Sequence, residues 1–97
     1  MNTYELTLIL PGSTTPAKKK AIIADIESLV KVNKGVLKET EDWGNIDLAY
    51  QISGNRVGSF IHFKLDLDSQ AVSIVDNKVL LNEEIIRHLL VKASKEK

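Results

Sequence analysis

Apolar side chains alternate with their neighbours in two segments of this chain, and a segment of helical periodicity lies between them. Within residues 4–10 and residues 61–67 every second side chain is apolar, which is typical of half-buried strands. Between these segments, the apolar side chains of residues 22–30 recur at helical spacing after Thr15–Pro16, a typical helix start. Gly35 is the expected left-handed terminator of that helix. The pattern predicts a sheet with one face covered by a helix.

The rest of the chain extends this pattern to six elements. Residues 36–52 are β-prone and are interrupted at Gly44, which predicts either one strand with a bulge, our preference, or two strands with a loop. A tight turn at 53–55 leads into the next strand. A second helix begins after Asp68 or Ser69 and ends near Asn82, and residues 85–91 form the last strand.

This order of elements is strand, helix, strand, strand, helix, strand. It predicts the α+β class and a ferredoxin-like split βαβ sandwich (βαββαβ), in which two helices cover one face of a four-stranded antiparallel sheet. Residues 1–97 are expected to form one such domain, with a frayed tail at 93–97.

Composition excludes several classes of protein. With 43% hydrophobic and 27% charged residues, the chain belongs with globular domains and not with disordered ones. The absence of cysteine excludes disulfides and thiolate metal sites. No signal peptide or membrane-spanning run is visible, so we expect a cytoplasmic protein that makes no membrane contact.

The net charge bears on nucleic-acid binding. Thirteen basic and thirteen acidic side chains cancel, whereas affinity for phosphate usually depends on surplus lysine and arginine. Only Arg56 and Arg87 carry guanidinium groups. Charge alone therefore does not predict an RNA-binding protein.

Enzymatic motifs are missing, so we expect no catalysis, no cofactor and no small-molecule substrate. Phosphatases of this fold class bind an anion through an arginine in the loop after the first strand, and residues 11–15 contain none. Glu41 and Asp42 are neighbours on a strand, so their carboxylates point to opposite faces and cannot act together. His88 lies between apolar residues and is expected to be a hydrogen-bonded residue at the edge of the core.

The last strand predicts a binding surface on the uncovered side of the sheet. Both of its faces are rich in apolar side chains, so only one set can pack under the helices. The other set, with two residues of the central strands, forms an apolar patch that we interpret as partner-binding: Ile85, Leu89, Val91, Ile9 and Phe60. The alternative is a small patch that lysine side chains partly cover.

Three segments carry specific residue patterns: Tyr4–Leu10, Glu41–Ile52 and Leu81–Lys92. The second contains a Trp-Gly pair followed by Leu-Ala-Tyr and Ile, and the third contains an asparagine followed by Ile-Arg. In these patterns, and in their order and separation, the chain resembles the family of the sixth protein of the bacterial small ribosomal subunit.

The resemblance implies a ferredoxin-like structural protein of the ribosome. Such a protein binds small-subunit ribosomal RNA together with the eighteenth small-subunit protein. Carried over by position, Arg87, Lys92 and Tyr4 become candidate RNA contacts. Trp43 and Tyr50 join the candidate partner-binding residues.

One segment departs from the family pattern. The family usually places basic residues after the glycine and often a proline before the isoleucine, whereas this chain has Asn45, Ile46 and Asp47, then Gln51. The missing charges predict weaker RNA binding by the chain alone. The alternative function is a free-standing ferredoxin-like regulatory or dimerisation module that binds no RNA, and an isolated chain is expected to be able to self-associate through its open face.

Overall fold

The computed structural model describes residues 2–52 and 54–93, and its elements follow the predicted order. The described residues form β1 (Asn2–Pro11), α1 (Pro16–Val32), β2 (Val36–Ile52), β3 (Asn55–Leu67), α2 (Ser69–Leu80) and β4 (Arg87–Lys92). In this part of the chain, no helix is long and apolar enough to cross a membrane.

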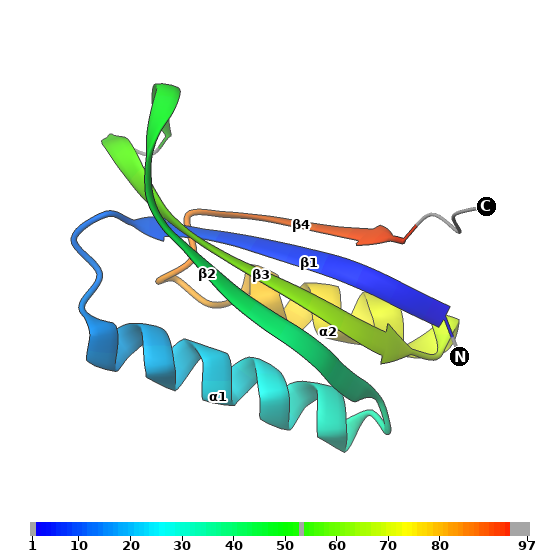
Figure 1. Cartoon of the computed structure of the whole chain (residues 1–97). Helices are drawn as coiled ribbons and strands as arrows, with labels where there is room; N and C mark the ends of the chain where they lie inside the picture. Colours follow the sequence, from blue (N-terminus) through cyan, green and yellow to red (C-terminus); the bar gives the residue numbers. More distant parts are fainter. Residues whose placement is uncertain (1, 53, 94–97) are drawn as a thin grey trace.

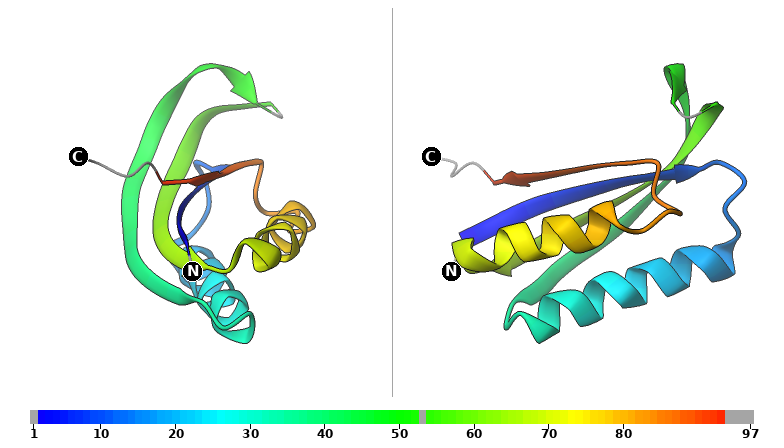
Figure 2. Two further views of the ribbon diagram at one scale, coloured as in Figure 1. Left: turned by 90° about the vertical axis from the view of Figure 1, so that its right-hand side faces the viewer. Right: turned by 180° about the vertical axis from the view of Figure 1, so that it is seen from behind.

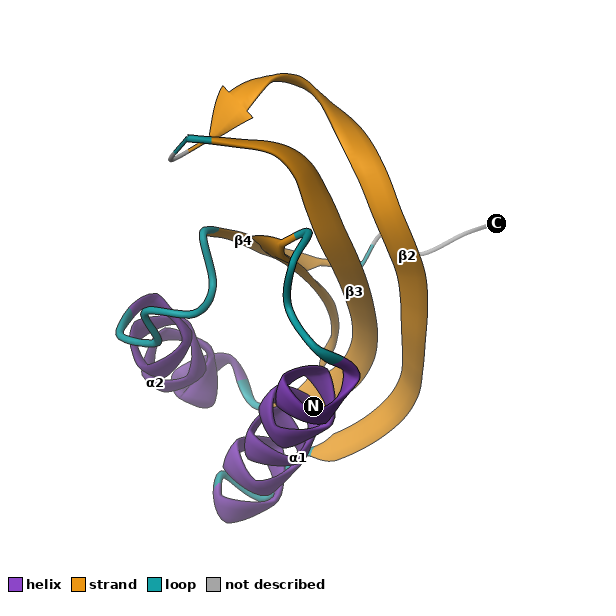
Figure 3. Ribbon diagram, turned by 90° about the vertical axis from the view of Figure 1, so that its left-hand side faces the viewer, coloured by secondary structure: helices purple, strands orange, loops and turns teal. Residues whose placement is uncertain are grey.

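The strands form one antiparallel sheet in the order β2-β3-β1-β4. β1 is paired on both sides, with β3 and with β4. Both helices lie on the same side of the sheet (Figure 1), inside the curve that β2 and β3 describe (Figures 2 and 3). This confirms the ferredoxin-like sandwich, and none of the described helices covers the other side of the sheet.

The core lies between the helices and the sheet. The alternating side chains of β1 and β3 that the sequence singled out point to this side, and Leu6, Leu8, Ile61 and Phe63 are fully buried. Helical spacing brings one stripe of each helix over them. These stripes consist of Ile22, Ile26 and Val30 in α1 and of Ala71, Val75 and Val79 in α2.

β2 is one long bent strand, as preferred from the sequence. Its pairing with β3 shifts register between Asp42 and Gly44, and Gly44 has a φ of +79°. Glycine reaches this left-handed conformation without the steric penalty of a Cβ. The bulge bends the strand, and the end of the β2–β3 hairpin extends beyond the helix layer (Figure 1).

Both ends of α1 are closed by local hydrogen bonds. The Thr15 side chain accepts from Lys18 N–H at 3.2 Å, with Pro16 at the first helical position. At the other end, Gly35 N–H donates to Val30 O and Lys34 N–H donates to Lys31 O, which is a Schellman motif. The left-handed residue is Lys34, with a φ of +63°, so the expectation that Gly35 takes this conformation was wrong.

Lys34→Gly is therefore expected to stabilise the protein by about 0.5–1 kcal/mol. A residue with a Cβ pays roughly 1–2 kcal/mol in the left-handed region, and the greater freedom of glycine in the unfolded chain offsets part of this gain. Urea denaturation of both proteins measures the difference. Lys31→Gly, in the last turn of α1, is the control and should destabilise; a loss of stability at both sites would contradict the strain at Lys34.

In the second half of the chain the predicted start of the second helix is confirmed, and the predicted start of the last strand needs correction. α2 follows Asp68 as the N-cap residue, but the Asp68 side chain makes no cap hydrogen bond. β4 begins at Arg87 and not at Ile85, because 82–86 forms turns after α2. Within the predicted tail, Ala93 N–H donates to Thr3 O at 2.9 Å, and 94–97 lies outside the described residues.

Candidate functional site

The side of the sheet away from the helices, called the open face here, carries side chains in cross-strand rows. The pairings of β2 with β3, β3 with β1 and β1 with β4 define the rows, because paired residues point to the same side. Across the sheet, one row is Glu39, Lys64, Glu5 and Val91, the next is Glu41, His62, Thr7 and Leu89, and the third is Gly44, Phe60, Ile9 and Arg87.

Trp43 lies flat on His62 in the middle row. The two rings are stacked, with centroids 4.8 Å apart and planes 12° apart. Trp43 Nε1 donates to Glu41 Oε1 at 2.9 Å, and His62 Nδ1 lies 2.9 Å from Thr7 Oγ1. These contacts fix both rings, while 47% of Trp43 remains exposed. The open face therefore presents a held aromatic ring at the bulge of β2.

Leu89 and Val91 form the apolar part of the open face on β4. They are 60% and 42% exposed, whereas Leu90, between them, packs against the core. His88 also points to the helix side, where its Nε2 lies 2.7 Å from Asp76 Oδ1 on α2. The expected exposure of Leu89 and Val91 is thus confirmed, and so is the expected place of His88 as a hydrogen-bonded residue at the edge of the core.

Charges are distributed unevenly over the open face. Glu41 contacts Trp43 in the middle row, and Glu5 and Glu39 lie in the neighbouring row with Lys64 between them. Glu5 Oε1 also lies 3.8 Å from His62 Nε2. In these rows Arg87 is the other cation, at the β4 edge. The region around Trp43 thus carries a surplus of carboxylates and is unfavourable for phosphate groups.

Three predicted contacts need correction or fall outside the described region. Tyr4 is only 7% exposed and belongs to the core, because its register in β1 points to the helices, so its ring cannot stack on RNA. Ile85 precedes β4 and packs against the core near Ile26 and Val79, not on the open face. The Tyr50 side chain lies outside the described residues.

Arg87 and Lys92, the candidate RNA contacts, lie at the two ends of the edge strand β4. Both are exposed. Arg87 pairs with Ile9 on the open face, and Lys92 pairs with Tyr4, whose register points to the helices. They are five residue steps apart along the strand, or roughly 16 Å. They cannot share one phosphate, although each can contact a different one along the β4 edge.

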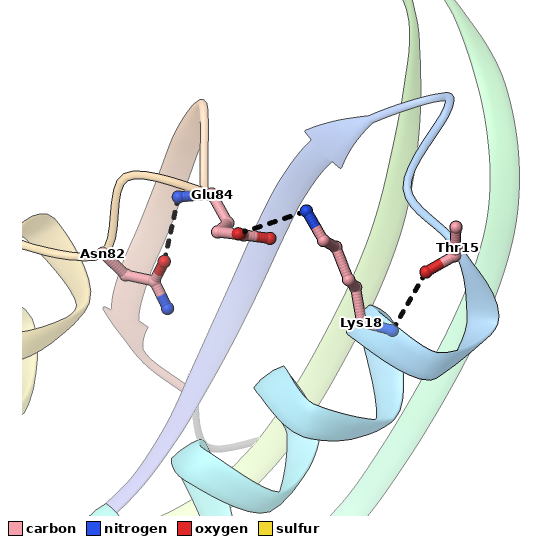
Figure 4. A network of polar contacts seen from close by, with 4 residues as sticks. All are labelled: Thr15, Lys18, Asn82 and Glu84. Atoms are coloured by element: carbon pink, nitrogen blue, oxygen red, sulfur yellow. Dashed lines mark hydrogen bonds and ion pairs between the residues drawn. The ribbon is translucent and has the colours of Figure 1, made fainter.

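The loop after β1 contains no anion site of the phosphatase kind. Thr15 caps α1, Lys18 Nζ lies 3.5 Å from Glu84 Oε2, and Asn82 Oδ1 accepts from Glu84 N–H at 2.9 Å (Figure 4). Thr15, Lys18 and Glu84 line a pocket beside this loop, and Glu83 also lines it. The two acidic residues would repel an anion. Among the described residues, no group of three or more metal-ligating side chains comes together.

Glu41 and Asp42 diverge as expected for neighbours on a strand. Glu41 holds Trp43 on the open face, whereas Asp42 Oδ2 lies 3.5 Å from Lys19 Nζ of α1 on the other side. The partnership of Trp43 with His62 and Thr7 was not predicted. The sequence did show that His62 lies on the polar side of β3. That Trp43 stacks on it depends on the shift in the β2–β3 pairing at the bulge.

Known proteins of one family are similar to this chain over nearly its full length. The family model for ribosomal protein S6 matches residues 3–92. The small ribosomal subunit protein bS6 of Pelagibacter ubique is 32% identical over 95 residues, which cover 98% of this chain and 78% of that protein. The bS6 protein of Rickettsia prowazekii is also 32% identical, over 96% of this chain and 77% of its own length.

A solved structure shows the same fold. The crystal structure of 30S ribosomal protein S6 from Thermotoga maritima superposes with a TM-score of 0.88 and covers 95% of this chain and 87% of that one, at 19% identity. The family match spans nearly every element described above, and the curated relatives agree with it over almost the full chain. The chain therefore belongs to the ribosomal protein S6 family.

Proposed function

We propose that this protein is a structural constituent of the small ribosomal subunit that binds small-subunit ribosomal RNA together with the eighteenth small-subunit protein. The open face is the observation that supports a protein partner. The large apolar side chains of Leu89 and Val91 are exposed on one side of the sheet, while the other side packs against the helices of the same chain. An apolar surface of this kind is typical of a protein-binding site.

The charge pattern indicates that the protein partner and the RNA contact different parts of the surface. Carboxylates dominate the middle of the open face, which disfavours phosphate there, whereas Arg87 and Lys92 stand at the ends of the β4 edge. Two separated cations supply only a modest electrostatic contribution to RNA binding. We therefore expect stable attachment to RNA to require the protein partner, with RNA passing along the β4 edge.

A pull-down from bacterial lysate at moderate salt, repeated after ribonuclease treatment, tests this function. The tagged protein is expected to recover small-subunit RNA and the eighteenth protein, and to retain the protein after the RNA is digested. Arg87→Gln is expected to lower RNA recovery severalfold and leave protein recovery unchanged. Lys31→Gln, which removes an exposed cation from α1, is the matched control.

Two results would contradict the proposal. Recovery of neither molecule, with a homodimer instead, would favour the free-standing dimerisation module. Loss of the protein partner on ribonuclease treatment would place the contact on RNA and not on the open face.

A further inference from the structure

We propose that Trp43 is a stacking platform for an arginine side chain of a basic protein segment that docks on the open face. The inference deepens the proposed function, on which it rests, by naming the chemical group that the partner places at this point. It commits to a protein cation and not to a nucleobase.

The ring of Trp43 is held before any partner arrives. Its Nε1 is bound to Glu41 Oε1, one of its faces lies on His62, and His62 is itself held by Thr7. Nearly half of the residue is nevertheless exposed. A ring fixed in this way loses little conformational freedom when a second planar group stacks on it, which favours binding.

The surrounding charge selects the planar group. An arginine guanidinium stacks on indole and is attracted by its π-face. The carboxylate of Glu41 lies in the middle row with His62, and those of Glu39 and Glu5 lie in the neighbouring row. A carboxylate has two oxygens that accept several hydrogen bonds, so Glu41 can bind Trp43 and also accept from a guanidinium beside the ring. A nucleobase would bring its phosphate toward the same carboxylates.

The side chain of lysine satisfies these conditions less well. Its ammonium group is compact and strongly hydrated and has no plane that matches the ring. The site is therefore expected to prefer arginine over lysine, and the preference is expected to depend on both Trp43 and Glu41.

Trp43 is the only tryptophan in the sequence, so its fluorescence reports the site directly. The full chain is titrated with a short arginine-rich peptide, with the same peptide carrying lysines, and with a single-stranded oligouridine. The arginine peptide is expected to change the fluorescence and to bind about fivefold more tightly than the lysine peptide. The oligouridine is expected to leave the fluorescence unchanged.

Three variants sharpen this experiment. Glu41→Gln keeps Trp43 as the fluorescent reporter and is expected to weaken binding of the arginine peptide severalfold. Trp43→Leu, followed by the anisotropy of labelled peptides, is expected to abolish the preference for arginine. Ile74→Ala is the matched control, because Ile74 on α2 is also 47% exposed but lies on the helix side; it should bind as the unaltered protein does. A thermal melt of each variant checks folding.

Equal binding of both peptides, or no binding, would overturn the inference, and a fluorescence response to oligouridine would replace it with a base-stacking site. Its failure is separable from that of the proposed function. If the pull-down recovers the protein partner equally with Trp43→Leu, only the arginine platform is wrong. If the unaltered protein recovers no partner, the proposed function fails whatever the peptides do.

Discussion

Gly35→Ala is expected to destabilise the protein by about 3 kcal/mol, at the upper end of the usual cost of overpacking. A Cβ at this position would lie 2.5 Å from the carbonyl oxygen of Asp66, 2.7 Å from Leu67 Cδ2 and 2.9 Å from Val30 Cγ1. The first of these atoms belongs to the backbone of β3, which is paired with strands on both sides. It cannot retreat without disturbing the sheet.

Gly44→Ala is the matched control for this prediction. Gly44 has a positive φ, and a Cβ added there would meet nothing within 4 Å, so only the conformational cost of roughly 1–2 kcal/mol applies. Denaturation in urea, followed by circular dichroism, gives both changes in the free energy of unfolding. If Gly35→Ala costs no more than Gly44→Ala, the contact between the end of α1 and β3 is looser than described.

Leu89→Asp is expected to weaken association with the protein partner at least a hundredfold and to change the free energy of unfolding by less than about 1 kcal/mol. Leu89 is 60% exposed in the free chain, so a carboxylate there stays hydrated and the core is untouched. Once a partner packs its apolar surface against this position, the same carboxylate loses its water inside an apolar contact, which costs several kcal/mol.

The variant is compared with Leu81→Asp in the pull-down and in urea denaturation. Leu81 is 75% exposed and follows α2, on the helix side of the sheet, so the same change of charge should leave association intact. Unfolding of Leu89→Asp would mean that the side chain belongs to the core and that the register of β4 is wrong. Retention of the partner by a folded Leu89→Asp would exclude the open face as its docking site.

The candidate site could be predicted from the sequence only in part. In β4 the exposure of Leu89 and Val91 followed from alternation, because the chain offered two apolar sets and only one could pack under the helices. Alternation failed for Ile85, because it lies before the strand begins. For Tyr4 the family resemblance implied an RNA contact, but its alternation with Leu6 and Leu8 places its ring in the core on the helix side.

The sequence by itself determined the six elements and the layer that each one faces. Periods of two and of 3.6 residues are properties of the local chain, so residues 4–10, 22–30 and 61–67 show them without any knowledge of their neighbours. The bulge at Gly44 and the cap at Thr15 were local in the same sense.

Tertiary structure alone decided which residues meet across the sheet. Trp43 lies on His62 because the bulge shifts the register of β2 against β3, and His62 lies beside Thr7 because β3 pairs with β1. Gly35 is required by the closeness of β3, a contact between segments about thirty residues apart in the chain, while Lys34 takes the left-handed turn. Such contacts depend on the relative placement of whole elements, which local periodicity does not encode.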